Sequence, residues 1–238
     1  MKLVIGGSTG FVGTELVRQA LLNKDVDSVV GLSRRETPAP VDLDKGRLKS
    51  VVCDDFTTYP DAVKEELRDV DACIWTIAVT PSKLQTVPHD EAIRISCDYA
   101  ITALQTLASL RQSSGGEGNG KPLRFILMTG HFTPRTPAEV HPLLKERGMS
   151  EYGLARGASE VKTLAFAQQS GATVEAAVAK PGMIVAPGVE RRNVPGIPEV
   201  ALRDVAAALL DQVVNGLEKD TLSNDDLVRI GQKVLAGP

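Results

Sequence analysis

Three glycines near the amino terminus follow one another at three-residue spacing: Gly7, Gly10 and Gly13. They stand between an apolar run at 3–5 and an apolar-periodic stretch at 14–23, which predicts a strand, a turn and a helix. A turn without side chains lets the backbone approach a pyrophosphate, and the amides of a helix amino terminus point at its charge. A glycine cluster alone is often only a tight turn, but in this context it predicts a dinucleotide site. The residues expected at the pyrophosphate are Gly7, Ser8, Thr9, Gly10, Phe11, Val12 and Gly13.

Two side chains further along have the chemistry of proton transfer. Tyr152 and Arg156 are four residues apart, so a helix over 150–169 places them one turn apart on the same face. A fixed cation favours the charged form of a phenol, which suits proton transfer to or from a substrate oxygen. An exposed aromatic residue beside an incidental arginine is the alternative. Thr129 ends an apolar run and presents a hydroxyl where the nicotinamide half of a dinucleotide would lie, whereas His131 is more typical of a loop residue than of a catalyst.

The ends of the other expected strands supply further cofactor contacts. The run that ends with Ser33, Arg34 and Arg35 carries no acid before Glu36. Paired arginines suit the 2′-phosphate of NADP(H), so NADP(H) is favoured over NAD(H), although such arginines also occur on solvated loops. After the expected strand at 48–53, the carboxylates of Asp54 and Asp55 either accept from the adenine amino group or cap the turn. Two further segments let the backbone come close to the cofactor: Ile77 and Ala78, and Pro181, Gly182 and Met183.

The order of apolar runs and helical patterns predicts the elements that hold these residues. Strands are expected at 26–32, 48–53, 72–77, 123–128 and 173–179, and helices at 89–111, 203–215 and after Ser223 or Asn224. This order predicts an α/β fold, a Rossmann-like doubly wound parallel sheet with helices on both faces, in one domain over 1–238. The polar stretch 113–120 is expected to be a flexible internal loop. The proline-rich stretches 133–142 and 186–198 are expected to form the walls of a substrate pocket, or to be inert surface.

Composition excludes several other classes of protein. The 238 residues carry a net charge of −3 with dispersed Lys and Arg, which argues against a nucleic-acid partner. The sequence lacks an apolar run of membrane-spanning length and a secretory layout at its start. Three cysteines without metal-ligand spacing predict buried, reduced thiols and no metal site. A cytoplasmic protein, monomeric or homodimeric, is expected.

The motifs resemble those of a known superfamily. Gly7-x-x-Gly10-x-x-Gly13, Tyr152-x-x-x-Arg156-Gly-x-x-Glu160 and Lys180-Pro181-Gly182-Met183 make the chain similar to atypical short-chain dehydrogenases/reductases, of the single-domain NmrA-like kind frequent in fungi. Active members hold a substrate carbonyl with Ser or Thr, use Tyr as the acid/base, and lower its pKa with a Lys that also binds the nicotinamide ribose. The resemblance assigns these roles to Thr129, Tyr152 and Arg156. Arginine in place of lysine is a departure that puts catalysis in question.

Three functions follow as hypotheses. The first is an NADPH-dependent reductase of a small carbonyl or enone, in which Thr129 binds the oxygen and Tyr152 supplies the proton. The second is a non-catalytic NADP(H)-binding regulatory protein, which the missing lysine favours. The third is a redox-neutral isomerase or dehydratase. The large carboxy-terminal substrate domain of sugar-nucleotide epimerases is absent from the pattern, so a nucleotide sugar is not the expected substrate.

Overall fold

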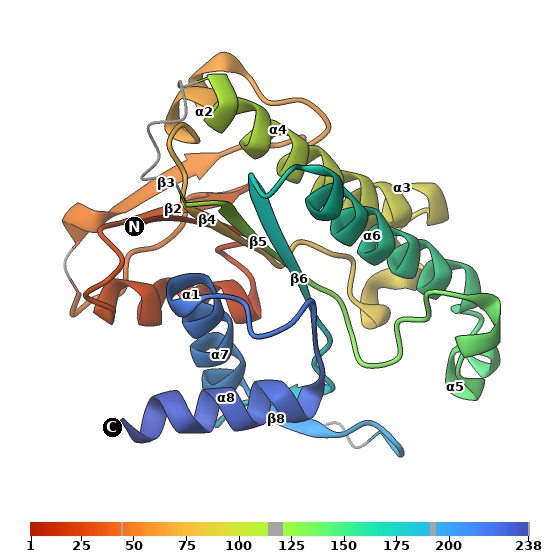
Figure 1. The fold of residues 1–238 in the computed structure, drawn as a ribbon. Coiled ribbons are helices and arrows are strands. Elements are labelled where there is room, and N and C mark those ends of the chain that lie inside the picture. Colours follow the sequence, from red (N-terminus) through yellow and green to blue (C-terminus); the bar gives the residue numbers. More distant parts are fainter. Residues whose placement is uncertain (44, 114–120, 191–193, 238) are drawn as a thin grey trace.

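The protein is built around one seven-stranded parallel sheet (Figure 1). The computed structural model describes residues 1–43, 45–113, 121–190 and 194–237. The strands lie in the order β3-β2-β1-β4-β5-β6-β9, and every pairing in this sheet is parallel. The strands are β1 (Lys2–Gly6), β2 (Ser28–Ser33), β3 (Leu48–Val52), β4 (Ala72–Trp75), β5 (Leu123–Met128), β6 (Val174–Ala179) and β9 (Thr221–Leu222). The order reverses between β1 and β4, so the predicted doubly wound Rossmann fold is confirmed.

Helices cover both faces of the sheet because its strands are apolar on both sides. Leu3 and Ile5 face one core with α1 (Phe11–Leu22), α7 (Leu202–Asn215) and α8 (Asn224–Ala236). Val4 faces the other core with α2 (Asp61–Glu66), α4 (Tyr99–Ser113) and α6 (Ser150–Gln169). The two sets of helices lie on opposite sides of the sheet in Figure 1. Parallel strands end at one edge, so the strand-end residues singled out in the sequence share that edge.

Shorter elements complete the chain. A second, two-stranded parallel sheet joins β7 (Met183–Val185) to β8 (Glu199–Ala201). The helix α3 (His89–Ile93) continues through a π-helical turn, Arg94–Asp98, into α4. The helix α5 (Pro142–Glu146) and 3₁₀ turns at Lys45–Arg47, Pro81–Thr86 and Pro137–Glu139 lie in the connections.

Some expected boundaries were wrong. The first helix begins at Phe11 rather than at residue 14, because its first turn includes Gly13, which packs against the carbonyl group of Gly7. The strand β2 begins at Ser28, and β4 ends at Trp75. The helix expected over 89–111 contains the π turn, which a four-residue apolar spacing does not distinguish from an α-helix. The cysteines are buried and free, as predicted. Of the predicted loop 113–120, residues 114–120 lie outside the described residues.

Candidate functional site

The turn after β1 is built so that only glycine fits at its two ends. Gly7 has a φ of +85°, and a Cβ there would stand 2.6 Å from Oγ1 of Thr76. A Cβ on Gly13 would stand 2.1 Å from the carbonyl oxygen of Gly7. The amide of Gly10 donates to that same oxygen at 2.9 Å. The turn and the first turn of α1 therefore meet through backbone alone.

The amino terminus of α1 is open to an anion. Gly10 occupies the N-cap position and no side chain caps the helix, so its first amides have no protein acceptor from a cap. A depression of about 340 Å³ lies there, lined by Thr9, Gly10, Phe11, Thr14, Glu15 and Leu202. The side chains of Ser8 and Val12 point elsewhere: the Ser8 hydroxyl is buried 2.6 Å from that of Thr37, and Val12 is in the core. The cradle fits a pyrophosphate held by backbone amides.

The end of β2 presents two free cations. Ser33 is buried, and its hydroxyl donates to the carbonyl oxygen of Arg35 at 2.5 Å. Arg34 and Arg35 are both exposed, and within the described chain neither forms an ion pair. Their guanidinium groups are available to a ligand at the edge where the adenosine half of a dinucleotide is expected.

The two carboxylates after β3 differ in their contacts. Asp55 accepts from the amide and the hydroxyl of Thr57, at 2.9 and 2.8 Å, and these bonds hold the pKa of Asp55 below its usual value. Asp55 therefore caps the turn, which is the second of the two roles that the sequence allowed for it. Asp54 is exposed.

The segment after β4 lies against the glycine turn. Thr76 donates to the carbonyl oxygen of Gly6 through its amide and its hydroxyl, at 2.9 and 2.8 Å. Ile77 is so close to Gly7 that a Cβ on this glycine would stand 3.1 Å from its Cγ1. Ile77 and Ala78 are half-buried, so the predicted cofactor contacts at 77 and 78 adjoin the turn.

Tyr152 is buried, and its hydroxyl has two protein partners. It donates to the carbonyl oxygen of Val79 at 2.6 Å and lies 2.8 Å from the hydroxyl of Ser96. The Ser96 oxygen accepts from the amide of Val79 at 2.8 Å, which leaves the Ser96 proton for the phenol oxygen. Ser96 comes from the π-helical turn, a type of irregularity frequent at functional sites.

Arg156 is linked to the end of β5. Its Nη2 donates to the carbonyl oxygen of Met128 at 3.0 Å, and the residue is 7% exposed. The structure therefore brings Arg156 next to the residue that precedes Thr129. The hydroxyls of Thr129 and Tyr152, in contrast, bond to different parts of the protein.

Thr129 belongs to a network of buried charge. Its hydroxyl donates to Oε1 of Glu160 at 2.6 Å. Glu160 is fully buried, and its Oε2 lies 2.7 Å from Nε of Arg135 and 3.3 Å from Nζ of Lys180. Arg135 also donates to the hydroxyl of Thr221 at 3.0 Å. This network joins the ends of β5, β6 and β9.

The stretch 133–142 is fastened to α6. A Cβ on Gly157 would stand 1.8 Å from the carbonyl oxygen of Pro134, so helix and loop touch through backbone. Nζ of Lys180 donates to the carbonyl oxygen of Thr133 at 2.6 Å. A wall at 133–142 would therefore be rigid.

Gly182 and Met183, which follow Pro181 after the end of β6, are held by contacts with Asn224 and Pro198. The amide of Gly182 donates to Oδ1 of Asn224 at 2.8 Å, and a Cβ on Gly182 would stand 2.0 Å from the carbonyl oxygen of Pro198. The amide of Met183 donates to that carbonyl at 2.8 Å. The stretch 186–198 is thus anchored at its end, while 191–193 lie outside the described residues.

Sequence reasoning did not assign roles to Glu160, Ser96 or Asn224. Glu160 lay inside a quoted motif, and a carboxylate on the buried face of the 150–169 helix was the available signal. Nothing in the pattern marked Ser96. Asn224 was considered as a cap of the last helix, but Ser223 provides that cap, and Asn224 is buried and bonds to Gly182.

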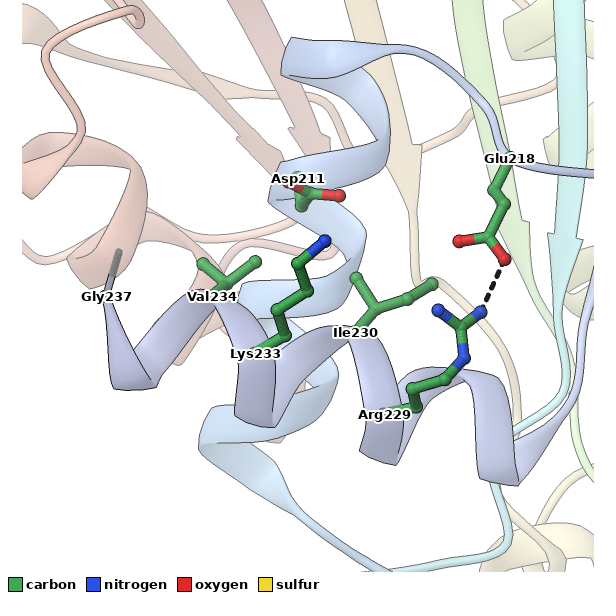
Figure 2. Close-up of a pocket in the computed structure, with 7 residues that line it drawn as sticks. All are labelled: Asp211, Glu218, Arg229, Ile230, Lys233, Val234 and Gly237. Atoms are coloured by element: carbon green, nitrogen blue, oxygen red, sulfur yellow. Dashed lines mark hydrogen bonds and ion pairs between the residues drawn. The ribbon is translucent and has the colours of Figure 1, made fainter.

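A second depression, of about 320 Å³, lies between α7 and α8 (Figure 2). It is lined by Asp211, Glu218, Arg229, Ile230, Lys233, Val234 and Gly237. Its Arg229 and Glu218 side chains pair with each other at 2.5 Å. The carboxyl end of α7 leads into a parallel strand, so this depression lies toward the opposite edge of the sheet from the glycine turn.

Two kinds of feature are absent from the described ranges, a cluster of metal ligands and a membrane-spanning helix. No group of three or more His, Cys, Asp or Glu side chains there is arranged to hold a metal ion. None of the helices in the described ranges has both the length and the apolar character that crossing a membrane requires.

No protein-family model and no curated protein matches the sequence. The fold does match solved structures. The dTDP-glucose 4,6-dehydratase DesIV from Streptomyces venezuelae, with NAD and TYD bound, superposes with a TM-score of 0.68, 18% identity, and coverage of 100% of this chain and 82% of its own. MoeE5 in complex with UDP-glucose and NAD gives a TM-score of 0.64, 18% identity, and coverage of 94% and 75%. The nucleoside-diphosphate-sugar epimerase from Agrobacterium tumefaciens gives a TM-score of 0.66, 16% identity, and coverage of 90% of this chain and 69% of its own.

The sheet order and the glycine turn after β1 define a Rossmann-type doubly wound fold. The solved structures named above share this doubly wound fold. Identities of 16–18% establish the likeness of fold alone.

Proposed function

We propose that the protein binds NADP(H) across the carboxyl edge of its sheet and uses it as an oxidoreductase on a small carbonyl or enone. The observation that carries this proposal is the glycine turn, which packs on α1 through backbone, together with the uncapped start of α1, located where the strand order reverses. Rossmann proteins bind dinucleotides at that point of the sheet.

The preference for NADP(H) rests on the end of β2. In this arrangement the adenosine half lies over β1, β2 and β3. A 2′-phosphate there would meet Arg34 and Arg35, which are exposed and have no carboxylate partner in the described chain. Guanidinium groups bind phosphate oxygens with paired, charge-assisted hydrogen bonds.

The nicotinamide half is then assigned to the ends of β4, β5 and β6, where NADPH supplies a hydride. Tyr152 is the proposed proton donor to the substrate oxygen. To reach that oxygen its hydroxyl must exchange the Val79 carbonyl for the substrate. Ser96 would continue to donate to the phenol oxygen.

A second candidate is a protein that binds NADP(H) without chemistry. The contacts of Tyr152 favour it, because the hydroxyl of this residue is buried and already has both a donor and an acceptor from the protein. A redox-neutral reaction is a third candidate, because a dehydratase and an epimerase are among the solved structures with this fold.

Turnover with a panel of small aldehydes, ketones and enones tests the proposal. The wild-type protein is expected to oxidise NADPH with some of them, and Tyr152→Phe is expected to bind NADPH equally well without oxidising it. NADPH binding without oxidation across the panel supports the second candidate. Product formed with no net change in nicotinamide absorbance supports the redox-neutral one.

A further inference from the structure

The hydroxyl of Thr129 has its proton already committed. Its two protein neighbours are Oε1 of Glu160 at 2.6 Å and the carbonyl oxygen of Ala179 at 3.5 Å. Both are acceptors, and a hydroxyl has one proton to give. The shorter of these contacts is the stronger hydrogen bond, so Thr129 donates to Glu160.

Glu160 is held as a fully buried acceptor. Arg135 and Lys180 contact its other oxygen at 2.7 and 3.3 Å, so two cations balance its charge inside the protein. Each cation has a further fixed partner, the hydroxyl of Thr221 for Arg135 and the carbonyl oxygen of Thr133 for Lys180. A carboxylate in this setting accepts hydrogen bonds and donates none.

This polarity decides which ligand group can meet Thr129. The residue is half-buried at the end of β5, and only the lone pairs of its oxygen are left for a ligand. A substrate carbonyl oxygen also offers only lone pairs, so the two do not pair. The carboxamide of nicotinamide carries an NH₂ group, which donates.

We infer that Thr129 accepts a hydrogen bond from the carboxamide NH₂ of bound nicotinamide, and that Glu160 is the positioning residue that fixes Thr129 as an acceptor. The inference rests on the proposed binding of NADP(H). It assigns Thr129 to the cofactor rather than to the substrate carbonyl, and it leaves Tyr152 as the contact for the substrate oxygen.

Three ligands separate the contributions in calorimetric titrations. NADP⁺ has the carboxamide, its 3-acetylpyridine analogue replaces the NH₂ with a methyl group, and 2′-phospho-ADP-ribose lacks the nicotinamide. The wild-type protein is expected to bind NADP⁺ about fivefold to tenfold more tightly than the analogue, as one hydrogen bond warrants. Thr129→Ser should keep this ratio, and Thr129→Val should bring it close to one.

Glu160→Gln tests the positioning role through the same ratio. A glutamine amide can donate to Thr129, which frees the Thr129 proton to donate and should lower the preference for NADP⁺. Affinity for 2′-phospho-ADP-ribose should be the same in every variant, so a general loss of structure is distinguished from a loss of polarity. If Glu160→Gln does not fold, the Thr129 variants still decide.

An unchanged ratio in Thr129→Val would overturn the inference and leave NADP(H) binding intact. Failure of the wild-type protein to bind any of the three ligands would overturn the proposed function, and this assignment with it.

Discussion

Two buried tyrosines give a matched test of how Tyr152 is held. Tyr152 and Tyr59 are 7% and 5% exposed, so replacing either by phenylalanine removes one hydroxyl from the interior. The Tyr152 hydroxyl bonds to Val79 and Ser96, whereas the Tyr59 hydroxyl is buried without a partner among the described residues. The two variants therefore differ in hydrogen bonding and not in the size of the change.

The expected stabilities follow from that difference. Tyr152→Phe should lower the free energy of unfolding by about 1–3 kcal/mol, because it leaves the Val79 carbonyl and the Ser96 hydroxyl without this partner. Tyr59→Phe should be neutral or stabilising, since a buried hydroxyl without a partner costs about 1–3 kcal/mol. For a chain of this size each kcal/mol moves Tm by about 2–4 °C.

Urea unfolding of the wild type and both variants measures the effect, with equal slopes as the check on two-state behaviour. Tyr152→Phe is expected to be the less stable variant by at least about 1 kcal/mol. Equal stability of the two variants would show that the Tyr152 hydroxyl is not held as described.

Three further predictions concern the turn, the arginines and the last helix. Gly13→Ala should lower the free energy of unfolding by about 2 kcal/mol, because a clash that costs about 3 kcal/mol is partly offset by about 1 kcal/mol of helix propensity. The same variant should weaken NADPH binding. Gly130→Ala is the control: its Cβ would meet nothing closer than 3.7 Å, so neither stability nor NADPH binding should fall. Replacing both Arg34 and Arg35 by alanine should weaken NADPH binding at least about tenfold and leave NADH binding unchanged in calorimetry, and an equal effect on both cofactors would contradict the 2′-phosphate assignment. Burial raises the pKa of Asp226, but hydrogen bonds from Lys219 and Ser223 outweigh it and hold this pKa below its usual value, so Asp226 stabilises the protein above about pH 4 and this contribution is lost as the pH falls. Urea unfolding between about pH 5 and 3 should show a smaller loss of stability in Asp226→Asn than in the wild type or Asp225→Asn, and identical pH profiles would contradict the capping geometry.

Six of the seven strands of the sheet and the glycine turn could be predicted from the sequence, because each is a local pattern. Strands β5 and β6 are mostly apolar segments with one charged residue each. Gly7 and Gly13 are six residues apart, so the contact between them is set within one strand-turn-helix unit. The short strands β7, β8 and β9 have two or three residues each, too few to establish a period.

The contacts of the candidate site were beyond a single sequence because they join distant positions. Glu160 meets Thr129, Arg135 and Lys180, which come from different strands and loops. The spacing of Tyr152 and Arg156 placed both on one helix face, but it did not indicate that the carbonyl oxygen of Val79 would accept a hydrogen bond from the phenol. Hydrogen-bond partners of this kind depend on how the elements pack, and that is decided by the whole fold.

The central claim is that the open start of α1 and the arginines after β2 bind a phosphorylated dinucleotide. Calorimetric titration of the purified protein with NADPH and NADH, side by side, tests it most directly. NADPH is expected to bind tightly and NADH much more weakly. Tighter binding of NADH would contradict the role given to Arg34 and Arg35, and binding of neither would contradict the dinucleotide site itself.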